Sequence, residues 1–296
     1  MSNSLQRILV AAIAIPAAIG IVYIGGLPFA LLVALLAGLG VSELFALARA
    51  QGIRPLAPLG IGAAAIFPLG VWWRYGGSFF YDNALNWLGA ASVLNSFPNL
   101  IAGWVLITLT ATLARRTPTD RPTAVAAITF LGPLYCGALP AFLLGIRYAV
   151  GPGRSWPATW VVFFPLAITW ICDTAAMYGG KVFKGPKLAP TVSPGKTRSG
   201  AVSGVVGGIV AALVYHRLAL VPSGIVLPTL QIILFGAVLA VTAQVGDLAE
   251  SLIKREAGVK DSSHLIPGHG GVLDRLDSLY FVIPVAAMLY QIMGVI

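Results

Sequence analysis

Charged residues are scarce in this sequence. Only 10% of the 296 residues are Asp, Glu, Lys or Arg, whereas 58% are hydrophobic; soluble domains carry about 25% charge. The mean hydropathy of +0.88 likewise excludes an ordinary soluble domain. The apolar runs are continuous and longer than the alternating segments of about ten residues in a transmembrane barrel. The composition therefore predicts an all-α, polytopic integral membrane protein.

Cysteine and histidine are also rare. Cys136 and Cys172 lie inside apolar runs without CxxC spacing, which favours packing over a disulfide or a thiolate metal site. His264 and His269 leave zinc open as an alternative, but carboxylates are more abundant nearby and favour magnesium. The net charge of +9 is explained by basic loops that face anionic lipid headgroups, so no nucleic-acid partner is expected.

Long apolar runs predict about nine transmembrane helices, because a span requires about 20 mostly apolar residues. Their approximate extents are 8–24, 29–48, 58–74, 97–114, 124–146, 159–179, 200–219, 230–250 and 278–295. If these spans alternate, all but four of the 19 Lys and Arg residues lie on one side. The positive-inside rule then places the N-terminus in the cytoplasm and the C-terminus outside.

Acidic residues are nearly absent from the first half of the chain. All but Glu43, Asp82 and Asp120 lie between positions 173 and 277. We therefore predict a transmembrane scaffold of about five spans over residues 1–150. Residues 151–296 are predicted to form a catalytic region of about four spans with two cytoplasmic polar loops. The polar segment 76–96 is predicted to be an external re-entrant or surface helix.

The end of the eighth predicted span carries acids at membrane depth. On a helix, Asp247, Glu250 and Lys254 share one stripe, and Gly246 allows another helix to approach beside Asp247. A salt bridge to Lys254 accounts for Glu250, but Asp247 lies deeper and has no such neighbour. Intramembrane acids without a local partner are functional candidates. Asp173 in the sixth span is expected to face the same polar cavity.

The segment after this span is broken by proline and glycine. His269 lies on a tight turn whose amides are suited to phosphate, and a helix is predicted to begin near Val272. Asp274 and Asp277 then lie one turn apart at its start, where acids also complement the helix dipole. Asp247 and Asp274 together are candidates for binding Mg²⁺, which takes few carboxylates and leaves sites for phosphate oxygens.

Residues 179–200 form the other polar loop. Its five cations and its glycine and proline breaks suggest a flexible basic lid for a di- or triphosphate, although cytoplasmic retention charge alone would explain the cations. The sequence PGKT is not a P-loop, because Pro190 replaces the required glycine and no strand is expected before it. Ser193 and Lys196 are the residues expected to touch substrate.

The segment from Ser251 to Asp277 resembles the signature of the phosphatidate cytidylyltransferase (CDP-diacylglycerol synthase) family. The residues that carry the resemblance are Ser251, Lys254, Arg255, Lys260, Asp261, His269, Gly270, Gly271, Asp274, Arg275 and Asp277. The stretches CDTAAMYGGK, KLAPTVSPGKT and GDLAES extend it over roughly residues 165–280. TRSG at 197–200 departs from the aromatic and the acid expected after Lys-Thr, and the first 150 residues match only as hydrophobic spans.

This resemblance implies a reaction in which CTP and phosphatidic acid give CDP-diacylglycerol and pyrophosphate, with Mg²⁺ required. Asp247 and Asp274 would hold the metal or a metal pair, with a second ion such as K⁺, and Asp261 and Asp277 would support them. The remaining implied site residues are Asp173, Ser193, Lys196, Arg198, Lys254, Arg255, Lys260, His269, Gly270, Gly271 and Arg275. The resemblance also implies a homodimer in the inner membrane, with its active site facing the cytoplasm.

Other functions fit the residues less well. A related enzyme could use another lipid, such as an archaeol phosphate or a polyprenol. A CDP-alcohol phosphotransferase requires an Asp-Gly pair, which this chain lacks. A cation transporter using Asp173, Asp247 and Asp274 is disfavoured because the acids and helix breaks lie in one half of the chain, whereas transporters often show corresponding breaks in both halves.

Overall fold

The computed structural model describes residues 3–76, 97–151, 153–265 and 270–296. Two compact units can be distinguished, and each is described by itself. Unit 1 comprises Met1–Gly25 and Gly145–Ile296, and unit 2 comprises Gly26–Leu144. The predicted surface or re-entrant helix falls almost entirely within residues 77–96, outside the described residues, so it stays a prediction.

Unit 2 is built from helices that pack around Phe45. Its elements are α2 (Gly26–Ala50), α3 (Ala57–Gly76), α6 (Phe97–Arg115), a 3₁₀ turn (Pro118–Asp120), α7 (Pro122–Pro133), a π-helical turn (Leu134–Ala138) and the start of α8 (Leu139–Ala149). Phe45 is fully buried. A Cβ atom on Gly60 or Gly132 would lie 2.4 or 2.7 Å from its ring. These two glycines therefore let α3 and α7 close on the ring from α2.

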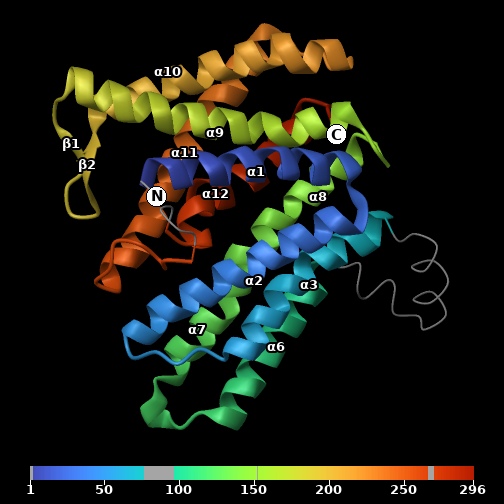
Figure 1. Cartoon of the computed structure of the whole chain (residues 1–296). Helices are drawn as coiled ribbons and strands as arrows, with labels where there is room; N and C mark the ends of the chain where they lie inside the picture. The colour runs from blue at the N-terminus through green and yellow to red at the C-terminus, as the bar shows by residue number, and fades with distance from the viewer. Residues whose placement is uncertain (1–2, 77–96, 152, 266–269) are drawn as a thin grey trace. The chain divides into compact units, whose positions relative to one another are not determined.

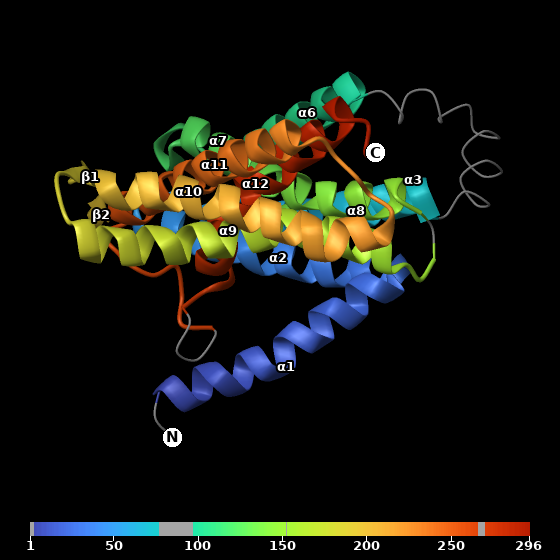
Figure 2. The same cartoon turned by 90° about the horizontal axis from the view of Figure 1, so that it is seen from above.

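Among its described residues, unit 1 contains five long helices and a small hairpin. Its elements are α1 (Asn3–Ile24), the end of α8, α9 (Trp156–Phe183), β1 (Lys187–Ala189), β2 (Ser193–Thr197), α10 (Arg198–Tyr215) with its π and 3₁₀ extensions (His216–Leu220 and Val221–Ser223), α11 (Thr229–Glu256) and α12 (Val272–Ile292). Helices α9 and α10 lie side by side, and the hairpin lies at one end of the pair (Figures 1 and 2).

The all-α prediction is confirmed, apart from this hairpin. Among the described residues, five helices are long and apolar enough to cross a membrane. They are Gly26–Ala50, Pro122–Ala149, Trp156–Phe183, Arg198–Ser223 and Thr229–Glu256. The chain is therefore an integral membrane protein with several apolar helices, and the count of nine spans stays a prediction.

The hairpin corrects one detail of the sequence analysis. Strand β1 does precede the PGKT sequence, which itself lies in β2, so the expectation that no strand precedes it was wrong. The strands pair antiparallel, with Lys187 opposite Thr197 and Ala189 opposite Ser193. Because PGKT is extended here instead of forming a loop before a helix, it still does not form a P-loop.

An aromatic stack joins four helices of unit 1, namely α9, α10, α11 and α12. The ring of Phe164 on α9 lies 5.2 Å from Tyr215 on α10 and 4.8 Å from Phe235 on α11, and Phe235 lies 4.9 Å from Tyr290 on α12. Both tyrosine hydroxyls donate hydrogen bonds to carbonyls of α9, at Trp160 and Val161. Stacked rings at these distances pack favourably, so this cluster fixes how the four helices meet.

A buried arginine caps the end of α1. Only 1% of Arg147 is exposed, and its guanidinium donates to the carbonyls of Val22 at 2.8 Å, Tyr23 at 3.0 Å and Gly151 at 2.9 Å, and to that of Gly153. The last carbonyls of a helix have no partner within the helix. Arg147 supplies those partners, which ties α1 to the chain segment after α8.

The aromatic stack gives a stability prediction. Phe235→Ala should lower the free energy of unfolding by about 3 kcal/mol, because a core ring is replaced by a cavity. Tyr290→Phe, which removes one hydroxyl and keeps the ring, should cost only about 1 kcal/mol. Thermal unfolding of the detergent-solubilised protein measures both changes. Equal effects of the two substitutions would contradict the importance of the stack.

Candidate active site

One polar cavity lies where α9, the hairpin, the start of α10 and α11 meet within unit 1. Its volume is about 660 Å³. The charged side chains that line it are Asp173, Lys181, Lys184, Lys187, Lys196 and Asp247. The two acids, far apart in sequence, therefore face one cavity, as expected from the sequence. The lysines give its walls a positive potential that suits a polyphosphate.

Lys196 is the cavity lysine that pairs with a predicted site acid. It extends from β2, and its Nζ lies 2.6 Å from Oδ2 of Asp247, with both side chains between a quarter and a third exposed. The Ser251 hydroxyl donates to the other oxygen, Oδ1, at 3.2 Å. Just after Lys196, Thr197 caps α10 by accepting a hydrogen bond from the Gly200 amide. The strand and the helix cap together direct Lys196 towards α11.

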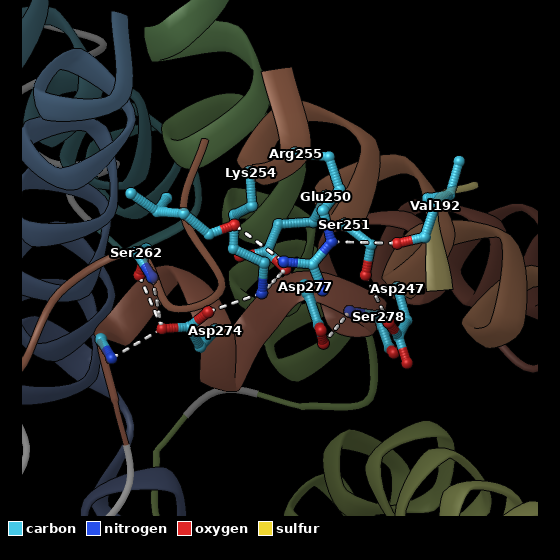
Figure 3. Close-up of polar contacts among 12 residues, drawn as sticks. Val192, Asp247, Glu250, Ser251, Lys254, Arg255, Ser262, Asp274, Asp277 and Ser278 are labelled. Carbon is cyan, nitrogen blue, oxygen red and sulfur yellow. Dashed lines mark hydrogen bonds and ion pairs between the residues drawn. The ribbon is translucent and has the colours of Figure 1, made fainter. Parts of the chain in front are cut away.

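Asp277 lies close to Asp173 and Asp247. A Cβ atom on Gly246 would lie 2.9 Å from the backbone oxygen of Asp277, so α11 and α12 approach closely beside Asp247. The carboxylates of Asp173, Asp247 and Asp277 lie within electrostatic range of one another. The Ser278 amide donates to Oδ1 of Asp277 at 2.5 Å (Figure 3). Three helices therefore bring like charges together next to the cavity.

Asp274 is held by protein groups at both of its oxygens. Oδ1 lies 2.6 Å from Lys254 Nζ. Oδ2 accepts hydrogen bonds from the Ser262 amide at 2.9 Å, the Ser262 hydroxyl at 2.8 Å and the Gly271 amide at 2.8 Å (Figure 3). Burial alone would raise the pKa of Asp274, but these donors outweigh it and hold the pKa below its usual range. Its carboxylate thus joins α11, the loop after α11 and the start of α12.

Arg255 contacts backbone in this structure. Its Nε donates to the carbonyl of Val192 at 3.2 Å, and another guanidinium nitrogen donates to that of Val259 at 2.9 Å. Val192 lies in the turn between β1 and β2. Arg255, which the resemblance assigned to phosphate, therefore ties the hairpin turn to the end of α11.

The other predicted site residues lie outside the cavity lining or outside the described residues. Arg198, Lys260, Asp261 and Arg275 are exposed, and Ser193 is half-buried in β2. Gly270 has a φ of 78°, a conformation that favours glycine. Gly271 donates to Asp274 as described above. His269, the predicted centre of the phosphate-binding turn, lies outside the described residues.

The donor set suits a hard cation better at Asp247 than at Asp274. No group of three His, Cys, Asp or Glu residues close enough to hold a metal ion occurs in the described part of the chain. Mg²⁺ is bound by one or two carboxylates together with substrate phosphates, so such a group is not required. The Asp247 carboxylate faces the cavity and, among the described residues, is held only by Lys196 and Ser251, and Asp173 and Asp277 lie nearby. The Asp274 carboxylate is almost fully buried and is already held by Lys254, by the amide and hydroxyl of Ser262 and by the Gly271 amide. Among the zinc candidates, His264 is exposed.

The sequence analysis did not identify several residues of this site. Gln244 lines the cavity and donates to the carbonyls of Ala201 and Ala240, which ties α10 to α11 next to Asp247. Ser262 supports Asp274, and Thr197 lines the cavity wall. The i, i−3 spacing of Gln244 before Asp247 is the one sequence signal that could have included Gln244.

The pKa of Asp274 gives a pH prediction. A carboxylate with a lowered folded-state pKa stabilises the fold above its unfolded pKa of about 4, and this stabilisation is lost as the pH falls through the folded value. The difference in melting temperature between the wild type and Asp274→Asn should therefore be full above about pH 5 and shrink below about pH 4. Asp261→Asn, at an exposed carboxylate, controls for loss of one charge. A difference that stays constant across this range would contradict the role of the ionised carboxylate.

Comparison with known proteins adds to this geometry. Residues 5–293 match the cytidylyltransferase family. The phosphatidate cytidylyltransferase of Bacillus subtilis is 30% identical over 285 residues, which cover 96% of each chain. That of Brucella suis is 43% identical over 129 residues, and the chloroplastic phosphatidate cytidylyltransferase 5 of Arabidopsis thaliana is 37% identical over 185 residues. These matches cover 44% and 56% of this chain, and 45% of the length of each of those two relatives.

Proposed function

Because this chain belongs to the cytidylyltransferase family, we propose that it transfers the cytidylyl group of CTP to phosphatidic acid. The products are CDP-diacylglycerol, a precursor in phospholipid biosynthesis, and pyrophosphate. The observation that carries this proposal is the lysine-lined cavity in which Lys196 meets Asp247 at 2.6 Å. Lysines beside carboxylates, in a protein built of apolar helices, support the binding of a polyphosphate together with a metal ion.

The reaction requires positioning more than a protein nucleophile. An oxygen of the lipid phosphate attacks the α-phosphorus of CTP, and the bond to the bridging oxygen breaks, so that pyrophosphate leaves with the electron pair. The attacking oxygen is already anionic, and no Ser, Cys or His nucleophile is needed. The protein has to align the two phosphates and neutralise the charge that develops. Lys181, Lys184, Lys187 and Lys196 are suited to that role.

Mg²⁺ is the proposed cofactor, with K⁺ as a candidate for a second ion. When bound, Mg²⁺ would neutralise phosphate charge. Asp247 is the ligand that the cavity supports best, with Asp173 and Asp277 near it. Asp274, the second ligand predicted from the sequence, would have to exchange one of its present hydrogen-bond donors for the metal. Asp261 is proposed only as an outer support.

The remaining predicted residues are proposed to act around the nucleotide and the lipid phosphate. Ser193 and Arg198 lie on the hairpin and at the start of α10, next to Lys196. Further phosphate contacts are proposed for Lys254, Arg255, Lys260, His269, Gly270, Gly271 and Arg275. For Lys254 and Arg255, such contacts would require a change from their present protein partners.

We also propose the arrangement in the membrane from the sequence. About nine spans, with a scaffold over residues 1–150 and a catalytic region over 151–296, place the N-terminus and the cavity on the cytoplasmic side of the inner membrane. A homodimer is proposed by family resemblance. Another phosphorylated lipid as the acceptor is the alternative substrate, and a panel of lipid phosphates tests it.

An assay with purified protein tests the proposed activity. Label from α-labelled CTP should appear in CDP-diacylglycerol only when phosphatidic acid and Mg²⁺ are both present. Asp247→Asn should lower kcat by at least about 100-fold, because the carboxylate that faces the cavity is neutralised. Tyr290→Phe, remote from the cavity lining, serves as the matched control and should retain wild-type kcat. No transfer by folded wild-type protein would refute the activity, and a near-normal Asp247→Asn rate would refute the assignment of Asp247.

A further inference from the structure

Glu250 is a buried acid that the proposed reaction does not use. It lies on α11, one turn from Asp247 and one turn from Lys254, and its side chain is fully buried. It does not line the cavity. A carboxylate in this place cannot meet a substrate in the cavity, so any effect on the reaction has to pass through its neighbours.

The nearest of those neighbours is Lys254. Its Nζ lies 2.6 Å from Oε2 of Glu250 and 2.6 Å from Oδ1 of Asp274. The side chains of Lys254 and Asp274 are only 10% and 5% exposed. One ammonium group therefore lies between two carboxylates from different helices, α11 and α12, in a place that water hardly reaches.

Stability alone does not account for the trio formed by Glu250, Lys254 and Asp274. Burying ions costs free energy that their attraction often fails to recover, and apolar replacements are frequently as stable. Oε1 of Glu250 accepts no hydrogen bond from any described residue. Such an arrangement fixes positions more effectively than it stabilises a fold.

The trio fixes the position of the start of α12. Asp274 lies in the first turn of α12, and Asp277 follows one turn later, where α11 and α12 approach closely at Gly246. A shift of Asp274 away from Lys254 would move Asp277 relative to Asp247. Displacements of about 1 Å in such sites can change rates by about 100-fold.

We propose that Glu250 is a positioning residue, which holds the Lys254 ammonium against Asp274 and thereby aligns the start of α12 with the acids of α11. The inference rests on the proposed function. Glu250 acts without touching a substrate, so it should influence the rate of the chemical step more than the binding of CTP.

Glu250→Gln tests this role, because the amide keeps the size of the side chain and cannot carry a negative charge beside Lys254. In the full-length solubilised protein, kcat should fall by about 10- to 100-fold, while KM for CTP changes by less than about threefold. Glu250→Asp keeps the carboxyl group but is one methylene shorter, and its kcat should lie between those of the wild type and Glu250→Gln. Melting temperatures are measured for every variant.

Tyr290→Phe is the matched control, because it also alters one buried polar group of unit 1 and leaves the trio intact. If Glu250 only stabilises the fold, Glu250→Gln will behave like this control, with a lower melting temperature and an unchanged kcat, and the inference is overturned. A raised KM with unchanged kcat would overturn it too.

Two further results separate the possible failures. If Glu250→Gln does not fold, Glu250→Asp decides, and a wild-type kcat for that variant overturns the inference. If the wild type itself shows no transfer from CTP, the proposed function fails. A normal rate of Glu250→Gln beside an active wild type refutes the positioning role alone.

Discussion

A charge in an apolar protein requires a partner, and the site of this chain is arranged around that constraint. Unpaired carboxylates and ammonium groups are costly to bury. Asp247 meets Lys196 from the hairpin, and Asp274 meets Lys254 from α11. Each pair joins two elements that are separate in sequence. The need to neutralise charge therefore also determines which elements lie next to each other.

The two pairs differ in their access to water, and this difference suggests different roles. The side chains of Lys196 and Asp247 are 27% and 29% exposed, and both line the cavity. A phosphate could take Lys196 and a cation could take Asp247 without leaving a buried charge alone. Lys254 lies between two almost fully buried carboxylates, and removing it would leave both unpaired. The Lys196–Asp247 pair is therefore suited to exchange with ligands. The pair of Lys254 and Asp274 is suited to holding α11 and α12 in place.

Features that depend on local periodicity could be predicted from the sequence. Apolar runs predict the long helices, and the i, i+4 spacing predicted the ion pair between Glu250 and Lys254, which the structure confirms. The shared cavity of Asp173 and Asp247 followed from two acids at membrane depth without local partners. These predictions need only the helix repeat and the cost of burying charge.

Contacts between distant segments could not be predicted in the same way. The link from Arg255 to Val192, the caps that Arg147 supplies to α1, and the link from Lys254 to Asp274 depend on how the elements pack. Nothing in the residue types distinguishes these cations from ones that bind phosphate. The β1–β2 pairing was missed because its glycine and proline residues suggested a flexible loop.

These contacts change what the charged segment from Ser251 to Asp277 does. Lys254 and Arg255 bond to protein carboxylates and carbonyls, and Asp274 accepts from protein donors at both oxygens. The groups that face the cavity come instead from α9, the hairpin, the start of α10, and Gln244 and Asp247 of α11. A signature segment can thus supply the frame of a site while neighbouring elements supply much of its surface. Substitutions of Lys254 or Asp274 should then act through the positions of the groups that face the cavity.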